Sequence, residues 1–150
     1  MMITIDQIKQ LREETGLSVL ECKKALEKSG GDIMSAKSLL REWGREVAEK
    51  KQAREAGEGM IECYVHTTGK VGVLVHMRCE TDFVAKSNEF RNLAHDLALQ
   101  VASMDPENVL SLLEQQYIKD SSKTIKNLIE EYIAKLGENI VVERFVRFQI

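Results

Sequence analysis

The feature that most constrains the fold is a change of hydrophobic period between residues 71 and 101. Along residues 71–79 apolar side chains return at every second position, the period of a half-buried strand: Val71, Val73, Val75, Met77 and Cys79. Further on they return at the spacing of one helical face: Phe90, Leu93, Ala94, Leu97, Ala98 and Val101. The segment Thr81-Asp82-Phe83-Val84 therefore lies where a strand ends and a helix begins. Such a junction can hold exposed side chains rigidly against a scaffold.

The first forty residues contain repeated signals for helix starts and stops. Thr4 with Gln7, and Ser18 with Glu21, each match the capping box, and Gly16 is suited to end the helix between them. Gly30-Gly31 ends the second helix, and Asp32 can cap a third. Residues 1–41 are therefore predicted to form a compact three-helix bundle.

Residues 42–58 are rich in charge and poor in apolar side chains. Glu46 and Lys50 lie four residues apart, a spacing that favours helix. We expect this segment to be a charged, solvated linker helix between two units.

The second unit, residues 59–150, predicts an α+β fold. A hairpin is expected from the alternation around Ile61 and Val65, the turn at residues 67–70 and the strand at 71–79. Helices are expected over residues 82–103, 108–116 and 125–136, the last ended by Gly137, followed by a strand over 140–148. Three antiparallel strands with the two main helices on one face would make a two-layer domain.

Composition excludes several function classes. The net charge of −3 comes from mixed charges without a basic face, which argues against a dedicated DNA or RNA binder. No apolar run approaches the roughly 20 residues needed to span a bilayer, and the amino terminus does not resemble a secretory signal. Cys22, Cys63 and Cys79 are too widely spaced for a zinc motif. We expect a cytoplasmic protein with reduced thiols and no membrane partner.

Motifs of catalysis are missing from the sequence. There is no phosphate-binding loop of the GxxxxGK[ST] type, no GxSxG motif and no HExxH motif. His66, His76 and His95 have no ligand-like spacing to acids or thiols. We therefore expect a protein that acts by binding, not an enzyme, with no cofactor and no metal.

Blocks of residues in a recognisable order lie along the whole chain. The first three are Leu11-Arg12-Glu13-Glu14-Thr15-Gly16, Cys22-Lys23-Lys24-Ala25-Leu26 and Gly31-Asp32-Ile33. They are followed by Glu80-Thr81-Asp82-Phe83-Val84-Ala85, Gly137-Glu138-Asn139-Ile140 and Arg144-Phe145-Val146-Arg147-Phe148. The chain with these blocks resembles the elongation factor Ts family, the nucleotide exchange factors of elongation factor Tu. The first three resemble the family's amino-terminal module, the fourth its signature and the last two its carboxyl-terminal end.

The resemblance implies a set of partner-binding residues. Phe83, with Thr81, Asp82 and Val84 around it, would act as an apolar wedge close to the magnesium region of elongation factor Tu. The amino-terminal bundle would dock on the partner's nucleotide domain, and a corner and a hairpin of the core would reach other parts of it. The residues implied for these contacts are Val19, Leu20, Lys23, Leu136, Gly137 and His66.

The resemblance also bears on assembly. Longer members of the family have a duplicated core and a coiled-coil insertion, whereas this chain has room for one core, so the compact form is the closer comparison. A two-fold homodimer would supply the second core and give an assembly of two factors with two copies of elongation factor Tu.

Simpler structural readings stay open. Phe83 is in helical phase with Phe90, which predicts core packing, and Asp82 can serve only to stabilise a helix start. Lys23 can be an ordinary surface residue, Leu136-Gly137 a helix stop and His66 a hairpin residue. The bundle also resembles the ubiquitin-associated (UBA-like) type, so the alternative function is an adaptor for ubiquitin-like or nascent chains.

Overall fold

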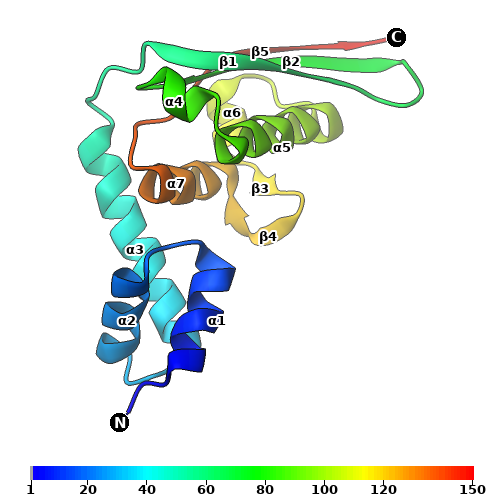
Figure 1. Ribbon diagram of the computed structural model, residues 1–150. Coiled ribbons are helices and arrows are strands. Elements are labelled where there is room, and N and C mark those ends of the chain that lie inside the picture. Colours follow the sequence, from blue (N-terminus) through cyan, green and yellow to red (C-terminus); the bar gives the residue numbers. More distant parts are fainter. Residues whose placement is uncertain (1) are drawn as a thin grey trace.

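The computed structural model describes residues 2–150, whose apolar side chains form two separate cores. A small core lies inside the amino-terminal helices, and a larger one lies beneath a three-stranded sheet (Figure 1). The predicted fold class, α+β with a helical amino-terminal bundle, is confirmed. No helix within residues 2–150 is long and apolar enough to cross a membrane.

The amino-terminal bundle begins with α1 (Ile5–Thr15) and α2 (Val19–Lys28), and both predicted capping boxes are present. Gly16 adopts the left-handed conformation at φ 71°, which ends α1 and turns the chain toward α2. The apolar faces of these helices and of α3 (Ile33–Lys51) bury Leu11, Cys22 and Leu26 completely.

Helix α3 runs unbroken from the bundle to the larger core, so residues 42–51 of the predicted linker are helical as the second half of α3, and residues 52–57 follow it without helix. Its second half packs against α7 (Ile125–Leu136). A Cβ added to Gly44 would lie 3.3 Å from the Cβ of Ala134, and Ala48 is fully buried in the larger core. Small residues at these two positions let the helices approach closely. Charged residues stand between Gly44 and Ala48, so this pair of small residues is not apparent in the sequence as a face for helix packing.

It stays a prediction that residues 1–41 and residues 59–150 are independent units.

The sheet contains β1 (Glu58–Val65), β2 (Val71–Cys79) and β5 (Val141–Gln149), in the order β1-β2-β5. Both pairings are antiparallel, as predicted, and the register between β2 and β5 shifts between His76 and Met77. Residues Val73, Val75, Met77 and Cys79 of the central strand point into the core. The opposite face of the sheet has no helix over it (Figure 1).

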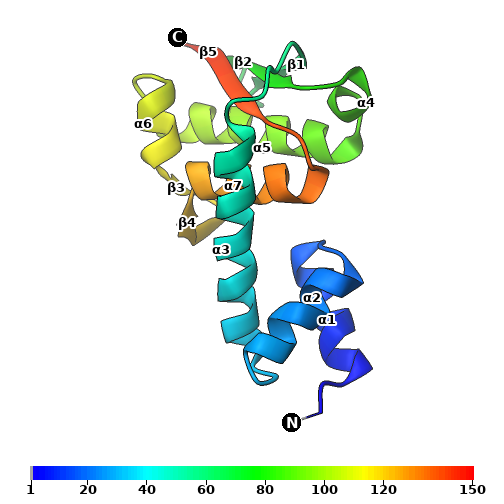
Figure 2. The ribbon, with the colours of Figure 1, turned by 90° about the vertical axis from the view of Figure 1, so that its left-hand side faces the viewer.

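The helices of the second unit form two layers where one was predicted. Helix α5 (Asn88–Met104) packs against β1 and β2, whereas α7 lies beyond α5 and packs against α3 (Figures 1 and 2). The predicted helix over residues 82–103 is divided into α4 (Asp82–Ala85) and α5. Helix α6 (Val109–Glu114) is followed by a small hairpin that was not predicted, β3 (Gln116–Tyr117) and β4 (Asp120–Thr124).

Candidate functional site

The turn between β2 and α5, residues 80–87, is held by two side-chain caps. The backbone N–H of Val84 donates to the Thr81 hydroxyl at 3.2 Å, which starts α4. The N–H of Phe90 donates to the Ser87 hydroxyl at 3.2 Å, which starts α5. Two helix starts six residues apart leave α4 as a single turn projecting from the end of the sheet (Figure 1). We call residues 80–87 the signature turn.

The signature turn presents Phe83 to solvent. Phe83 is 84% exposed, whereas the next residues, Val84 and Ala85, are each only 7% exposed and pack into the larger core. Asp82 is also exposed, and its carboxylate lies 3.6 Å from the Lys86 ammonium group. An exposed ion pair of this kind contributes little to stability. The turn thus offers Phe83 and Asp82 outward and uses Val84 as an internal anchor, so the Val84 side chain is not available to a partner.

A residue that sequence reasoning did not single out, Glu138, binds this turn. One oxygen of its carboxylate accepts the backbone N–H groups of Glu80 at 3.1 Å and Thr81 at 3.0 Å. The other oxygen accepts the Thr81 hydroxyl at 2.7 Å. Glu138 stands in the Gly137-Glu138-Asn139-Ile140 block, but nothing in the local pattern points to a partner 57 positions away.

The predicted docking residues of the bundle share the first turns of α2. Val19 and Leu20 are 50% and 61% exposed, and Lys23 is exposed one turn later. The Ser18–Glu21 capping box fixes the start of the helix that carries them, while Cys22, which points toward the core of the bundle, is fully buried. The structure therefore places an apolar pair and a cation on one accessible helix face.

The corner at Leu136-Gly137 and the hairpin residue His66 occupy different ends of the core. Leu136 packs partly against the larger core, and Gly137 ends α7 at φ 77°. The Gly137 carbonyl accepts the Lys51 ammonium at 2.5 Å, so the corner is attached to the end of α3. His66 is exposed near the β1–β2 turn, with its Nδ1 2.9 Å from the Tyr64 hydroxyl.

The structure brings only some of the predicted residues together. Hydrogen bonds through Glu138 place the signature turn beside the Gly137 corner. The α2 face lies in the bundle, on the same side of α3 as α4 but toward its other end (Figure 2). The β1–β2 turn beyond His66 is at the end of the sheet away from α4 (Figure 1). A single partner would have to be large enough to touch surfaces on both units.

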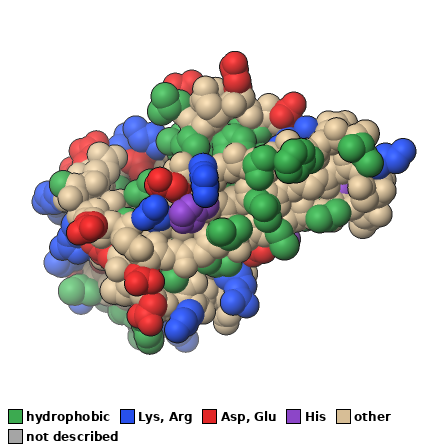
Figure 3. Space-filling model, turned by 90° about the horizontal axis from the view of Figure 1, so that it is seen from above, with side chains coloured by type: hydrophobic (Ala, Val, Ile, Leu, Met, Phe, Trp, Pro, Cys, Tyr) green, Lys and Arg blue, Asp and Glu red, His purple; other side chains and the backbone are tan. Residues whose placement is uncertain are grey.

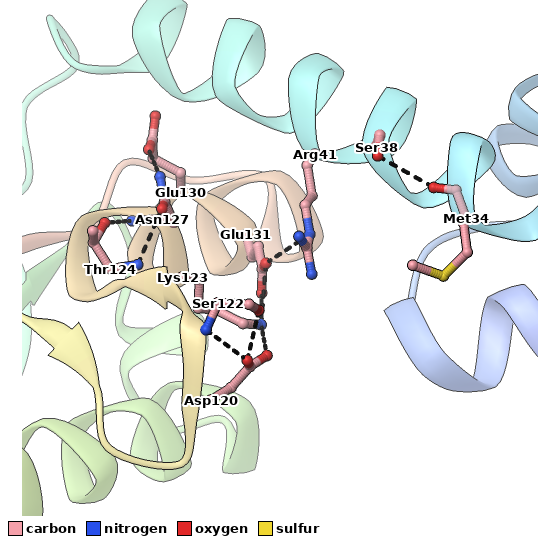
Figure 4. Close-up of polar contacts among 10 residues, drawn as sticks. All are labelled: Met34, Ser38, Arg41, Asp120, Ser122, Lys123, Thr124, Asn127, Glu130 and Glu131. Atoms are coloured by element: carbon pink, nitrogen blue, oxygen red, sulfur yellow. Dashed lines mark hydrogen bonds and ion pairs between the residues drawn. The ribbon is translucent and has the colours of Figure 1, made fainter.

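A cleft of about 470 Å³ separates the bundle from β4 and α7. Figure 4 shows its charged lining, in which Arg41 Nε of α3 lies 3.9 Å from a Glu131 oxygen and Lys123 Nζ lies 2.9 Å from the other. Partly exposed ion pairs contribute at most about 1 kcal/mol each. These pairs therefore add little to the packing of α3 against α7, where Gly44 and Ala134 approach closely.

The outer face of the sheet is uncovered and unevenly charged. Hydrophobic side chains gather over one part of it, and basic, acidic and histidine side chains over another (Figure 3). The exposed apolar residues of the strands are Ile61, Val65, Leu74, Val146 and Phe148. Arg78 Nε lies 3.1 Å from a Glu143 oxygen without hydrogen-bond geometry, and buried His76 Nδ1 has no partner within residues 2–150.

Two of the three thiols, Cys22 and Cys79, are buried. Burial, with the charge of Glu138 nearby, raises the pKa of the Cys79 thiol to about 11, and burial also raises the pKa of Cys22. Both thiols are therefore protonated and poorly nucleophilic at neutral pH. Within residues 2–150, no three His, Cys, Asp or Glu side chains are grouped to hold a metal ion.

Comparison with known proteins identifies the family. The family model described as elongation factor TS matches residues 80–150, from the signature turn through β5. Elongation factor Ts of Coprothermobacter proteolyticus is 44% identical over 195 aligned positions, which include 100% of this chain and 99% of the relative. Those of Herpetosiphon aurantiacus and Thermotoga petrophila are 42% and 43% identical and cover 100% of this chain, with 98% and 97% of their own lengths aligned.

The alignments also define how this chain differs from those relatives. Because 195 positions are aligned to 150 residues, the relatives contain residues that have no counterpart here. They are nonetheless aligned almost end to end, and the signature turn falls within the matched family region. The chain belongs to the elongation factor Ts family.

Proposed function

We propose that this chain is a guanine nucleotide exchange factor that promotes GDP release from elongation factor Tu during translation elongation. The observation that carries the proposal is Phe83, an aromatic side chain that is 84% exposed on a turn held by Thr81 and Ser87. An aromatic residue costs free energy when it is left in water. A large apolar side chain on such a rigid support is typical of a binding hot spot.

The proposed mechanism is a coupling of two binding equilibria. GTPases hold their nucleotide through a magnesium ion and a phosphate-binding loop. An exchange protein that binds the nucleotide-free GTPase best lowers the affinity of the GTPase for nucleotide. Bound nucleotide lowers the affinity of the GTPase for the exchange protein by the same ratio. Phe83, with Asp82 beside it, would enter the partner near the magnesium site and disturb its geometry. The factor itself would break no bond.

The bundle would supply a second contact. Val19, Leu20 and Lys23 lie on one exposed face of α2, and an apolar pair with a neighbouring cation suits the surface of another protein. The Gly137 corner and His66 are proposed as further contacts on the core. Cytoplasmic residence follows from this role as part of the same proposal.

Release of a fluorescent GDP analogue from elongation factor Tu tests the function directly. In stopped-flow mixing, the release rate should rise with the concentration of the factor and then saturate. A rate that stays unchanged at saturating factor contradicts the proposal. The exposed apolar pair of α2 also suits the adaptor alternative, which predicts binding to ubiquitin-like chains without any effect on GDP release.

We further propose that two copies associate through the open face of the sheet. Five exposed apolar residues share this face, and a monomer seldom leaves such a patch in water. A two-fold axis through the face would cover the same patch on both copies. Multi-angle light scattering of the factor alone and with elongation factor Tu tests for a dimer and for a two-plus-two assembly.

A further inference from the structure

Glu138 satisfies three hydrogen-bond donors of the signature turn with one carboxylate. The N–H groups of Glu80 and Thr81 share one oxygen at 3.1 and 3.0 Å, and the Thr81 hydroxyl donates to the other at 2.7 Å. Hydrogen bonds to a charged acceptor are about twice as strong as those between neutral groups. The contact therefore fixes both the backbone and the side chain of Thr81.

Thr81 transmits this restraint to α4. Its hydroxyl has one hydrogen, which is donated to Glu138, so the oxygen lone pairs are free to accept the Val84 N–H at 3.2 Å. Phe83 lies between these two anchored residues. Helix α4 has only four residues, too few to be stable by its own backbone hydrogen bonds. The direction in which Phe83 points therefore depends on how firmly Thr81 is held.

The residues on both sides of Glu138 are held in turn by the last residue of α3 and by the segment that follows it. The Gly137 carbonyl accepts Lys51 Nζ, and Asn139, which is 3% exposed, donates from Nδ2 to the Arg54 carbonyl at 2.9 Å. Ile140 follows in the larger core. Glu138 thus stands on a rigid segment between two anchored neighbours, which suits it to hold another group in place.

We propose that Glu138 is a positioning residue for nucleotide exchange: it holds Thr81 and α4 so that Phe83 is presented in one orientation. The inference rests on the proposed exchange function. It requires no contact between Glu138 and the partner. Without the carboxylate, Phe83 would remain exposed but would no longer be preorganised, and part of the binding free energy would be used to order it.

The first test compares Glu138→Ala with Glu138→Gln in stopped-flow GDP release. Misplacing a working group by about 1 Å can lower a rate about 100-fold, so Glu138→Ala should lower the saturating release rate by about 10-fold to 100-fold. Glu138→Gln should restore most of the rate. Its amide oxygen can accept both backbone N–H groups, and its NH₂ can donate to the Thr81 hydroxyl.

Asp96→Ala is the matched control. The Asp96 carboxylate also binds two groups far along the chain, the Tyr117 hydroxyl at 3.0 Å and Lys119 Nζ at 2.7 Å. It restrains β3 and the loop after it, and it makes no contact with the signature turn. Asp96→Ala should lose stability to a similar extent and retain the wild-type release rate.

A double-mutant cycle separates positioning from general damage. If Glu138 acts through Phe83, Glu138→Ala should have little further effect on release when Phe83 is already alanine. An undiminished effect in that background overturns the proposal, as does a wild-type release rate for Glu138→Ala. If Glu138→Ala does not fold, the same cycle is measured with Thr81→Val, which removes both the hydroxyl link to Glu138 and the cap of α4 that depends on it.

Amide hydrogen exchange of the free factor gives a readout that does not depend on elongation factor Tu. Glu138→Ala should increase exchange at Glu80, Thr81 and Val84, whereas Asp96→Ala should leave these amides unchanged. Unchanged protection in Glu138→Ala overturns the positioning role, whatever the release rates are. A wild-type factor that fails to speed release overturns the exchange function instead, so the two failures are distinguishable.

Discussion

Phe83 and Phe90 lie seven residues apart, close to two turns of a helix, yet Phe83 is 84% exposed and Phe90 is fully buried. The chain leaves the helical path at Lys86 and Ser87 and starts a new helix at Asn88. Helical phase therefore does not carry from Phe90 back to Phe83. This relationship removes core packing as an explanation of Phe83, and the contact of its side chain with a partner is our proposal.

Phe83→Ala should slow GDP release far more than it destabilises the fold. Truncation of a hot-spot residue costs about 2 kcal/mol or more, a factor of roughly 30 in affinity or rate. An exposed side chain contributes little to folding, so the free energy of unfolding should change by less than about 0.5 kcal/mol. Stopped-flow release and denaturant unfolding measure the two effects on one preparation.

Phe90→Ala is the control for that comparison. Removing a buried phenylalanine costs about 3–5 kcal/mol, so this variant should lose stability on that scale. If Phe83→Ala loses stability on the same scale, the wedge role is wrong.

The sequence was sufficient for elements whose signals are local. Both amino-terminal capping boxes, the stop at Gly137 and the three alternating strands were predicted correctly. The break after α4 was missed because Ser87 was read as an ordinary helix residue, although its distance from Phe90 is that of an N-cap from its third residue. The apolar stripe of residues 90–101 favoured one continuous helix, and the Ser87 hydroxyl was too weak a signal to predict a break in it.

Features that depend on distant contacts could not be predicted. The hairpin β3–β4 is held by Gln100, a fully buried residue of α5 whose side chain binds the Gln116 carbonyl and the Ile118 N–H. Glu138 and Thr81 meet only because β2 and β5 are neighbours in the sheet. In the site itself, the resemblance to a family implied the exposed residues of α4 and α2. The hydrogen bonds by which Glu138 holds the turn before α4 could be found only in the folded chain.

Fragments beginning at residues 42 and 57 should differ in stability. A fragment from Gly57 keeps all three strands of the sheet, but the structure gives the larger core the buried Ala48 and the donor Lys51, which that fragment lacks. The shorter fragment loses both, together with the Gln52 and Arg54 carbonyls that accept from Asn139. At about 1 kcal/mol per lost hydrogen bond, it should be less stable by about 2 kcal/mol or more.

Thermal unfolding of the two fragments checks this expectation. Both should bind elongation factor Tu weakly, because both lack Val19, Leu20 and Lys23. Equal melting temperatures would mean that the second half of α3 is dispensable to the core, and undiminished affinity would mean that the bundle is not a docking module.

In the folded chain at pH 8, only Cys63 should react with iodoacetamide, provided that no second copy covers the open sheet face on which Cys63 lies beside Leu74. Cys63 is exposed, whereas Cys22 and Cys79 are fully buried with raised pKa values. Mass spectrometry should find one label per chain and none in Cys63→Ser, until denaturant exposes the other two. Two labels on the native wild type would contradict the packing around the buried thiols.

The raised pKa of Cys79 also predicts a loss of stability in alkali. The folded state keeps this thiol protonated up to about pH 11, whereas the unfolded chain releases the proton near its ordinary pKa of 9.0. The stabilisation is therefore complete below about pH 9 and declines as the pH rises through 11. Cys79→Ala should weaken this dependence when denaturant unfolding is measured between those pH values.

Phe148→Asp should convert a dimer into a monomer without unfolding the chain. Phe148 is 70% exposed on the open face of the sheet, so a charge there is tolerated by the monomer but costly when a second copy covers it. Leu110→Asp, at a 73% exposed position on α6, is the control and should leave the molar mass unchanged. A wild-type protein that scatters as a monomer, alone and in an active one-to-one complex, contradicts the dimer.

Because α3 is unbroken, the bundle and Phe83 would bind one partner through a rigid connection. Its 19 residues span about 28 Å, and its attachment to α7 leaves no flexible tether between the bundle and Phe83. Once the bundle has bound, Phe83 would reach the partner at a high effective concentration, set by a stiff connection rather than by the search volume of a loose chain. The same stiffness would select partners by the distance between their two binding surfaces. One or two residues inserted into α3 would therefore weaken binding even if every contact residue were unchanged.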